Sequence, residues 1–294
     1  MIQFDYSLLF DSPIVQVADI RWQPRDGNPT VEFTSPRPEI TFQRQGMFLK
    51  HQGRRRVACD PATLVLFNEG ESYRMMHPVR RRCACTAVLL GTRVLADIVQ
   101  RSGAWAGDRP DNLFRFDECV CEPDVAAMHC ELYAAARRPG TDPVAIEELA
   151  VTIARRVVES THRFHVVGRL PARRAQTRRA HADIVQAVRE LLAARFHERL
   201  SLGEIAGHVH CAPNHLCWLF RLHTGMTIRR YIVRLRLAAA MERLAAGPVS
   251  LARLATELGF ANHGHFTTLF RREFSVQPSR LFRRPADAGT AANT

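Results

Sequence analysis

The sequence predicts an α+β fold with a β-rich first part and an all-α second part. The first observation is that residues 1–90 form short segments rich in Val, Ile, Thr and Phe, with turn residues about every ten positions. The second is that apolar residues recur at helical spacing from about Asp183 to Phe282. The third is an internal repeat, because residues 250–276 restate the pattern of residues 201–226.

The β-rich part is predicted from segments that read ADIRW, TVEFT, EITFQRQGMFLKHQG, RRVACD, ATLVLFNEG and CACTAVLL. Their spacing is typical of a sandwich or barrel. From Thr92 the pattern changes to helices: VLADIVQRSG, then Pro123–Arg138, then Pro143–Thr161. We interpret the last two helices as candidate dimerisation elements. The segment 166–180 contains Pro, Gly and Arg without an apolar period, and it is predicted to be a linker.

The repeat predicts two helix-turn-helix units. Leu202, Ile205, Ala206 and Val209 correspond to Leu251, Leu254, Ala255 and Leu258, and Leu216, Leu219 and Phe220 correspond to Phe266, Leu269 and Phe270. In each copy a short break separates two such apolar faces. The helix expected between the units, Thr227–Ala246, would be about 30 Å long, close to the ~34 Å between adjacent major grooves of DNA. It also carries arginines that can meet phosphates or acidic neighbours: Arg229, Arg230, Arg234, Arg236 and Arg243.

The positive charge is confined to the repeated part. Residues 173–284 hold 19 Arg against 7 Asp and Glu, whereas residues 1–172 hold 22 Lys and Arg against 21 Asp and Glu. A basic segment beside a neutral one is typical of a nucleic-acid binder. We find no run of 18 apolar residues and no basic leader, and eight Cys are too sparse for a disulfide scaffold. The expectation is a cytoplasmic protein with reduced thiols and no membrane partner.

The last hundred residues resemble the DNA-binding domain of AraC/XylS-type transcription regulators. The resemblance rests on IAGHVHCAPNHLCWLFRLHTGMTIRRYIVRLRLAAA and on LATELGFANHGHFTTLFRREFSVQPSRLFR. It implies a regulatory part at 1–165 with a cupin-like β-barrel and appended helices, a linker at 166–180, a double helix-turn-helix domain at 181–284 and a tail at 285–294. It further implies a homodimer that binds promoter double-stranded DNA and alters RNA polymerase recruitment, more often as an activator. A small-molecule effector in the first part is a hypothesis from fold analogy.

The same resemblance assigns roles by position. The recognition helices would be Pro213–Leu222 and Asn262–Arg272. The residues expected to face bases are Asn214, Cys217, Trp218, His263, Gly264, Thr267 and Thr268, and those expected to hold phosphates are Arg221, Arg229, Arg271 and Arg272. The chain departs from the family pattern in the first unit, with His210 at the usual turn Gly and Ala212 at the usual capping Ser. Its second unit has Gly264 and Ser275 where Ser and Gly are common.

Several alternatives stay open. Trp218 could be a half-buried packing residue, and the arginines could form a solvated face. Cys83-Ala-Cys85 and Cys119-Val-Cys121, with Cys59 or Cys130, could bind a soft metal or sense redox state, although buried thiols are the simpler interpretation. No catalytic motif occurs, so we expect no enzyme, cofactor or metal. Other functions are a nonspecific nucleoid protein, or a regulator whose first part only dimerises. Arg54–Arg56 and Arg80–Arg82 could face an anionic ligand.

Overall fold

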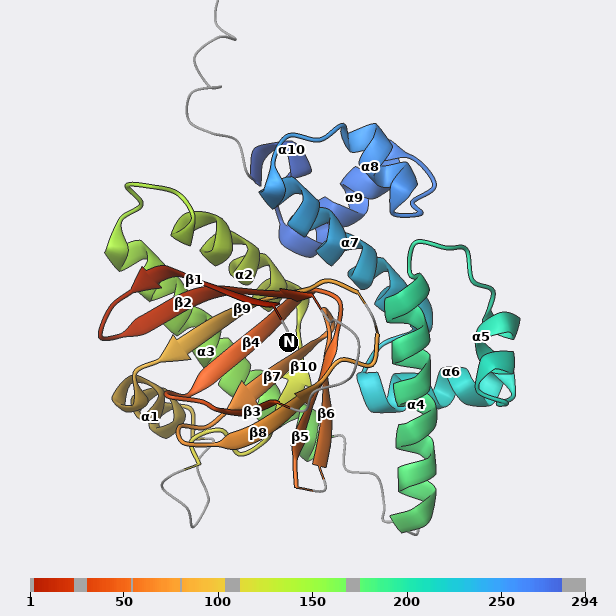
Figure 1. The fold of residues 1–294 in the computed structure, drawn as a ribbon, viewed down its shortest axis with the longest axis horizontal. Coiled ribbons are helices and arrows are strands. Elements are labelled where there is room, and N and C mark those ends of the chain that lie inside the picture. Colours follow the sequence, from red (N-terminus) through yellow and green to blue (C-terminus); the bar gives the residue numbers. More distant parts are fainter. Residues whose placement is uncertain are drawn as a thin grey trace, which may run out of the picture.

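The computed structural model describes residues 3–23, 31–53, 55–79, 81–103, 112–167 and 175–281. Two facing antiparallel sheets with three helices form the first part, and the rest is helical (Figure 1). The predicted α+β class is therefore confirmed. The predicted tail at 285–294, residues 168–174 of the predicted linker, and Arg54 and Arg80 lie outside the described residues.

Within the residues that the structure describes, ten strands make the two sheets. The larger has the order β1 (Gln3–Asp11), β2 (Val15–Gln23), β9 (Cys83–Leu90), β4 (Glu39–Gln45), β7 (Thr63–Phe67) and β10 (Glu118–Val120). The smaller has the order β3 (Val31–Thr34), β8 (Ser72–Met76), β5 (Phe48–Gln52) and β6 (Arg55–Cys59). Large side chains pack together between them: Trp22, Phe48, Phe67 and Tyr73. Strands β1, β8 and β10 were not among the predicted segments, because β1 and β8 contain no Val, Ile or Thr and β10 has only three residues.

The other face of the larger sheet is covered by helices α1 (Thr92–Arg101), α2 (Pro123–Ala136) and α3 (Pro143–Val167). Alternate residues of the strands point to this face, and they pack against apolar residues of the helices. All three helices were predicted. Helix α3 ends beyond the expected Thr161, inside the segment assigned to the linker.

The second part contains α4 (Ala175–Arg195), α5 (Leu202–His208), α6 (Pro213–Thr224), α7 (Ile228–Ala246), α8 (Leu251–Glu257), α9 (His263–Phe274) and α10 (Pro278–Leu281). Helices α5–α6 and α8–α9 are the two predicted units, and α7 joins them (Figure 1). Helix α4 begins earlier than the expected Asp183 and takes up the end of the predicted linker. Within the described residues, none of the helices combines the length and apolarity needed to cross a bilayer.

Side-chain caps fix helix starts in both units. Ser201 and Glu204 form a reciprocal capping box at α5, and the Asn262 side chain accepts a hydrogen bond from the His265 backbone N–H at α9. Ala212 supplies no such cap to α6. The turn of the first unit puts His210 at φ 49°, where the second unit has Gly259 at φ 80°. The first unit thus has a non-glycine residue in the left-handed region at its turn, and the second unit has one, Ser275 at φ 57°, at the end of α9.

Candidate nucleic-acid interface

Helix α6 has one buried face and one exposed face. Leu216, Leu219 and Phe220 pack into a core with residues of α4 and α5. Asn214, Cys217, Trp218 and Arg221 are exposed, as expected for residues that face a groove. The Trp218 side chain remains 52% exposed, yet its ring stacks on His215. Trp218 therefore both packs against a neighbouring side chain and keeps about half of its surface exposed to solvent.

Helix α9 repeats this arrangement. Phe266, Phe270 and Phe274 are buried, and Leu269 is half-buried. The exposed residues are His263, Gly264, Thr268, Arg271 and Arg272. Thr267 is half-buried, and its hydroxyl lies 3.3 Å from His263 Nε2. Both recognition helices therefore turn their expected contact residues outward, except that Thr267 is partly covered.

The arginines of α7 divide into two groups. Arg229 and Arg230 are exposed, so they are available to phosphates. Arg234 is buried, donates to the Cys121 carbonyl and pairs with Glu273 at 2.6 Å, while Arg243 pairs with Glu257 at 2.9 Å.

Arg236 connects the two units. Its guanidinium donates to the carbonyls of Phe196 (2.7 Å), Glu198 (2.8 Å) and Gly259. Because these carbonyls belong to the turns before α5 and before α9, Arg236 fixes one unit against the other. Three of the five α7 arginines are thus occupied within the protein.

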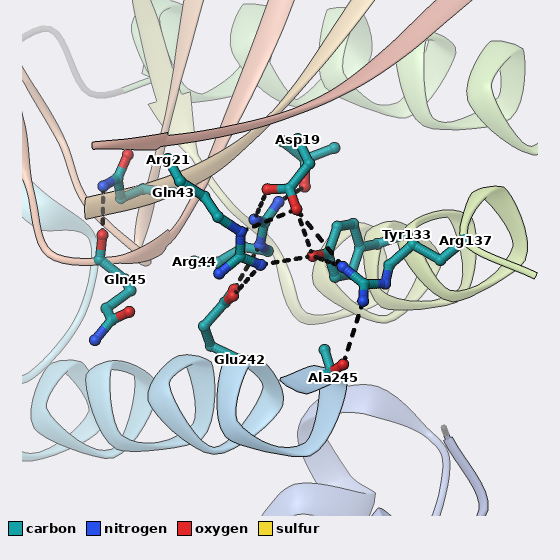
Figure 2. A network of polar contacts seen from close by, with 10 residues as sticks. Asp19, Arg21, Gln43, Arg44, Gln45, Tyr133, Arg137, Glu242 and Ala245 are labelled. Atoms are coloured by element: carbon teal, nitrogen blue, oxygen red, sulfur yellow. Dashed lines mark hydrogen bonds and ion pairs between the residues drawn. The ribbon is translucent and has the colours of Figure 1, made fainter. Parts of the chain in front are cut away.

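A buried network of charges joins α7 to the larger sheet (Figure 2). The Arg44 side chain is 0% exposed, its Nε donates to Glu242 at 2.7 Å, and it also pairs with Asp19. Arg21 reaches the other oxygen of Glu242 at 2.5 Å. Burial alone would raise the pKa of Asp19, but the charges of Arg44 and Arg21 outweigh burial and lower that pKa. Glu242 is thus the point at which α7 is held to the sheet.

Helix α2 completes this network. The Tyr133 hydroxyl donates to Asp19 at 3.1 Å, and its ring lies 4.1 Å below the Arg44 guanidinium. Arg137 donates to that hydroxyl at 3.0 Å and to the Ala245 carbonyl of α7 at 3.4 Å (Figure 2). The network therefore contains residues from two strands, α2 and α7.

A second carboxylate, Asp60, holds the first helix-turn-helix unit. It follows β6 and is 1% exposed. One of its oxygens accepts from Arg189 Nε of α4 at 2.6 Å and from the Tyr231 hydroxyl of α7 at 2.5 Å. Its other oxygen accepts from the Ala62 backbone N–H, which fixes the carboxylate.

Neither Asp60 nor Glu242 was identified from the sequence. Asp60 ends the predicted β segment RRVACD, and Glu242 is one of several acidic residues in the helical part. Their partners lie more than a hundred residues away, and no local spacing pairs them.

The cysteines of the first part are buried. Cys83 and Cys85 point to one side of β9, toward Cys59 between the sheets, whereas Cys119, Cys121 and Cys130 pack on the helix side. Burial raises the pKa of Cys83 to about 12 and that of Cys121 to about 11. Because the thiolate is the species that binds metals and attacks disulfides, these environments favour the packing role. Among the described residues, no three His, Cys, Asp or Glu side chains are grouped to hold a metal ion.

Comparison with known proteins finds relatives of the helical part. The family described as "Helix-turn-helix domain" matches residues 205–284. The transcriptional activator RhaS of Pectobacterium carotovorum is 36% identical over 97 residues, which cover 33% of this chain and 35% of that protein. RhaS of Escherichia fergusonii is 39% identical over 97 residues, or 33% and 34% of the two chains. The chain thus matches these curated relatives over about a third of their length.

The alignments with solved structures have lower sequence identity and low TM-scores. ToxT of Vibrio cholerae aligns over 92% of this chain and 98% of its own, at 12% identity and a TM-score of 0.36. A regulator with an AraC-type DNA-binding domain from Chromobacterium violaceum aligns over 37% of this chain and 96% of its own, at 24% identity and a TM-score of 0.33.

The resemblance and the family match fall on the same residues, which the structure folds into two helix-turn-helix units about α7. The C-terminal third of this chain is an AraC-type helix-turn-helix domain.

Proposed function

We propose that the chain is a sequence-specific transcription regulator that reads double-stranded DNA in two adjacent major grooves. The observation that carries the proposal is the pair of outward-facing recognition helices, α6 and α9, on the basic part of the chain. Helix α7 has 19 residues and therefore spans about 28 Å, close to the ~34 Å between adjacent major grooves.

The base contacts follow from side-chain chemistry. Asn214 suits adenine, with which a side-chain amide forms two hydrogen bonds. Trp218 and Thr268 suit the methyl group of thymine, and His263 offers a ring nitrogen to a base edge. Cys217, Gly264 and Thr267 complete the surfaces that face the bases.

Phosphate contacts supply affinity without sequence preference. We assign them to Arg221, Arg229, Arg271 and Arg272, which are all exposed. The role is regulatory and not catalytic, and it needs no cofactor or metal.

The first part, residues 1–165, is proposed to dimerise and to bind a small-molecule effector, while residues 181–284 bind DNA. Aromatic rings fill much of the space between the sheets, which disfavours an effector there. A groove of about 470 Å³ between α1 and α3 offers more room, with apolar walls (Val94, Ile98, Val151) and charged edges (Arg101, Arg155, Glu159). The named relatives are transcriptional activators, which supports an activating role for this chain. Recruitment of RNA polymerase and a cytoplasmic location are proposed from the family resemblance alone.

Selection from random DNA tests the proposal. The purified full-length chain is incubated with a random library, and a recovered site is competed against bulk DNA at fixed salt. We expect a preference of at least ~10³-fold for the recovered site. A preference near one would refute the proposal and support the nonspecific nucleoid alternative.

The effector is tested separately. A ligand that binds only the folded protein raises its melting temperature. A metabolite panel that never moves the melting temperature, together with a dimer in solution, would support the dimerisation-only alternative.

A further inference from the structure

Three aromatic rings meet at the edge of the first helix-turn-helix unit. On α4, Val185, Val188 and Leu192 form the stripe that packs against α6. His181 continues this stripe by one helical turn toward the start of α4, beyond the apolar core. There it reaches two side chains of α6 that are one turn apart, His215 and Trp218.

The rings contact one another in two ways. Trp218 stacks on His215, with ring centroids 5.7 Å apart and planes 22° apart. His181 approaches both rings edge-on, at 6.4 Å and 89° to Trp218 and at 5.8 Å and 71° to His215. Offset-stacked and edge-to-face pairs are the arrangements that aromatic rings prefer. The indole is therefore held on one face by α6 itself and at one side by α4.

The held indole still offers a surface to DNA. Trp218 is 52% exposed, and it is adjacent on α6 to the exposed Asn214, Cys217 and Arg221. A side chain that is already held before binding loses less conformational freedom when it binds. An indole has a single polar atom, the donor Nε1, so the rest of its exposed edge can make only apolar contacts.

We propose that His181 and His215 are positioning residues that hold Trp218 as a pre-set reader of one thymine methyl group. This inference rests on the proposed function, and it adds a residue of α4 to the elements that determine specificity. Within the major groove the thymine methyl is the one apolar group that a base presents, so it matches the apolar indole surface. His181 does not contact the base and acts only through the orientation of Trp218.

Replacing thymine by deoxyuridine isolates the methyl group. Each thymine of a recovered site is replaced in turn, and the affinity of full-length protein is measured at fixed salt. For the wild-type protein, we expect the replacement of one thymine, in the half of the site read by α6, to lower the affinity about fourfold. That factor corresponds to ~0.8 kcal/mol for the burial of a methyl group. Trp218→Ala should abolish that loss.

The positioning role predicts the behaviour of the histidine variants. His181→Ala and His215→Ala should reduce the thymine-to-uracil effect below twofold, and His215→Phe, which keeps a ring for stacking, should restore it. The thymine read by Thr268 in the other half-site is an internal control, whose effect should remain unchanged in all these variants. His208→Ala, at the exposed end of α5, is the matched histidine control and should behave as wild type.

A second measurement requires no DNA. Acrylamide quenching of the Trp218 fluorescence is obtained by difference between each protein and its Trp218→Phe counterpart. We expect His181→Ala and His215→Ala to raise the quenching constant, while the melting temperature shows that the fold persists.

Two results overturn the proposal: an unchanged quenching constant, or a full thymine effect in both alanine variants. A lower salt dependence in His181→Ala would also refute it, because the imidazole would then be contacting a phosphate. If the wild-type protein shows no preference for any DNA site, the proposed function is refuted. The proposal that Trp218 reads a thymine methyl group is then refuted as well. The quenching result would still say whether the rings hold Trp218.

Discussion

Glu242→Gln tests how strongly the helical part is held to the sheet. The change keeps the size of the side chain and removes the charge that pairs with Arg44 and Arg21. Arg44 is 0% exposed and Glu242 is 7% exposed, so the pair is shielded from water. Removing one partner of a buried pair costs about 3–5 kcal/mol, because the other charge stays buried.

The contacts that Arg44 and Arg21 keep in the variant determine where within this range the loss of stability should fall. Arg44 keeps Asp19, and Arg21 is 38% exposed and can turn to solvent. We therefore expect the lower end, about 3 kcal/mol. Urea unfolding followed by far-UV circular dichroism and tryptophan fluorescence measures the change, and a loss below about 1 kcal/mol would refute this account of the interface.

Two further variants separate charge from packing. In Arg44→Met with Glu242→Leu both charges are replaced by apolar groups, and we expect most of the lost stability to return. Glu257→Gln is the matched control, because Glu257 pairs with two exposed arginines on the surface. It should cost less than ~1 kcal/mol. If Glu242→Gln and Glu257→Gln lower the free energy of unfolding by similar amounts, burial of the network does not add to the stability of the protein.

Four other predictions follow from single residues. Arg221→Ala should weaken binding to all DNA sequences alike and lower the salt slope by about one, as titration of affinity against salt will report. Gly259→Ala should destabilise the second unit by ~2 kcal/mol or more in urea, because φ is 80° and the new Cβ would lie 2.6 Å from the His197 carbonyl oxygen. Ala212→Ser should add about 1 kcal/mol by capping α6, measured in the same way. The lowered pKa of Asp19 means that its contribution is present above its unfolded pKa of about 3.9 and is lost as the pH falls through the folded pKa, so acid unfolding should be shallower in Asp19→Asn.

The helical part could be predicted closely because its signals are local. Apolar spacing identified α5, α6, α8 and α9. The exposed residues of the recognition helices were assigned by position from the family resemblance. The early start of α4 was missed because its first residues, Ala175–Ala180, lack apolar periodicity and are followed by the first core residues only at Ile184 and Val185.

The connections between the parts could not be predicted from a single sequence. In a list of 29 acidic residues nothing distinguishes Asp60, since its importance depends on where α4 and α7 come to rest. Arg234 and Arg236 were grouped with arginines that could meet phosphates or acidic neighbours, and composition does not show which of the two a given arginine meets. Arg234 meets the acidic neighbour Glu273, whereas Arg236 meets backbone carbonyls. Helical spacing places Arg234 with the buried Ala238 and Met241, but that signal becomes decisive only when the partner surface is known.

These connections give α7 a different role from the one that the sequence predicts. From the sequence it is a spacer between two DNA-reading units, and a spacer needs only the correct length. In the structure its first half completes the core of the first unit through Ile228, Tyr231 and Leu235, and that core also includes Ala62 from the β part. Its second half belongs to one continuous core with the larger sheet, α2 and the phenylalanines of α9. A shift of α7 against the sheet would therefore move both recognition helices, since close-packed interiors do not deform gradually. Any signal received by the first part can reach the DNA-reading surface through this helix, which Asp60 holds to the end of β6 and Glu242 holds to Arg44 of the larger sheet.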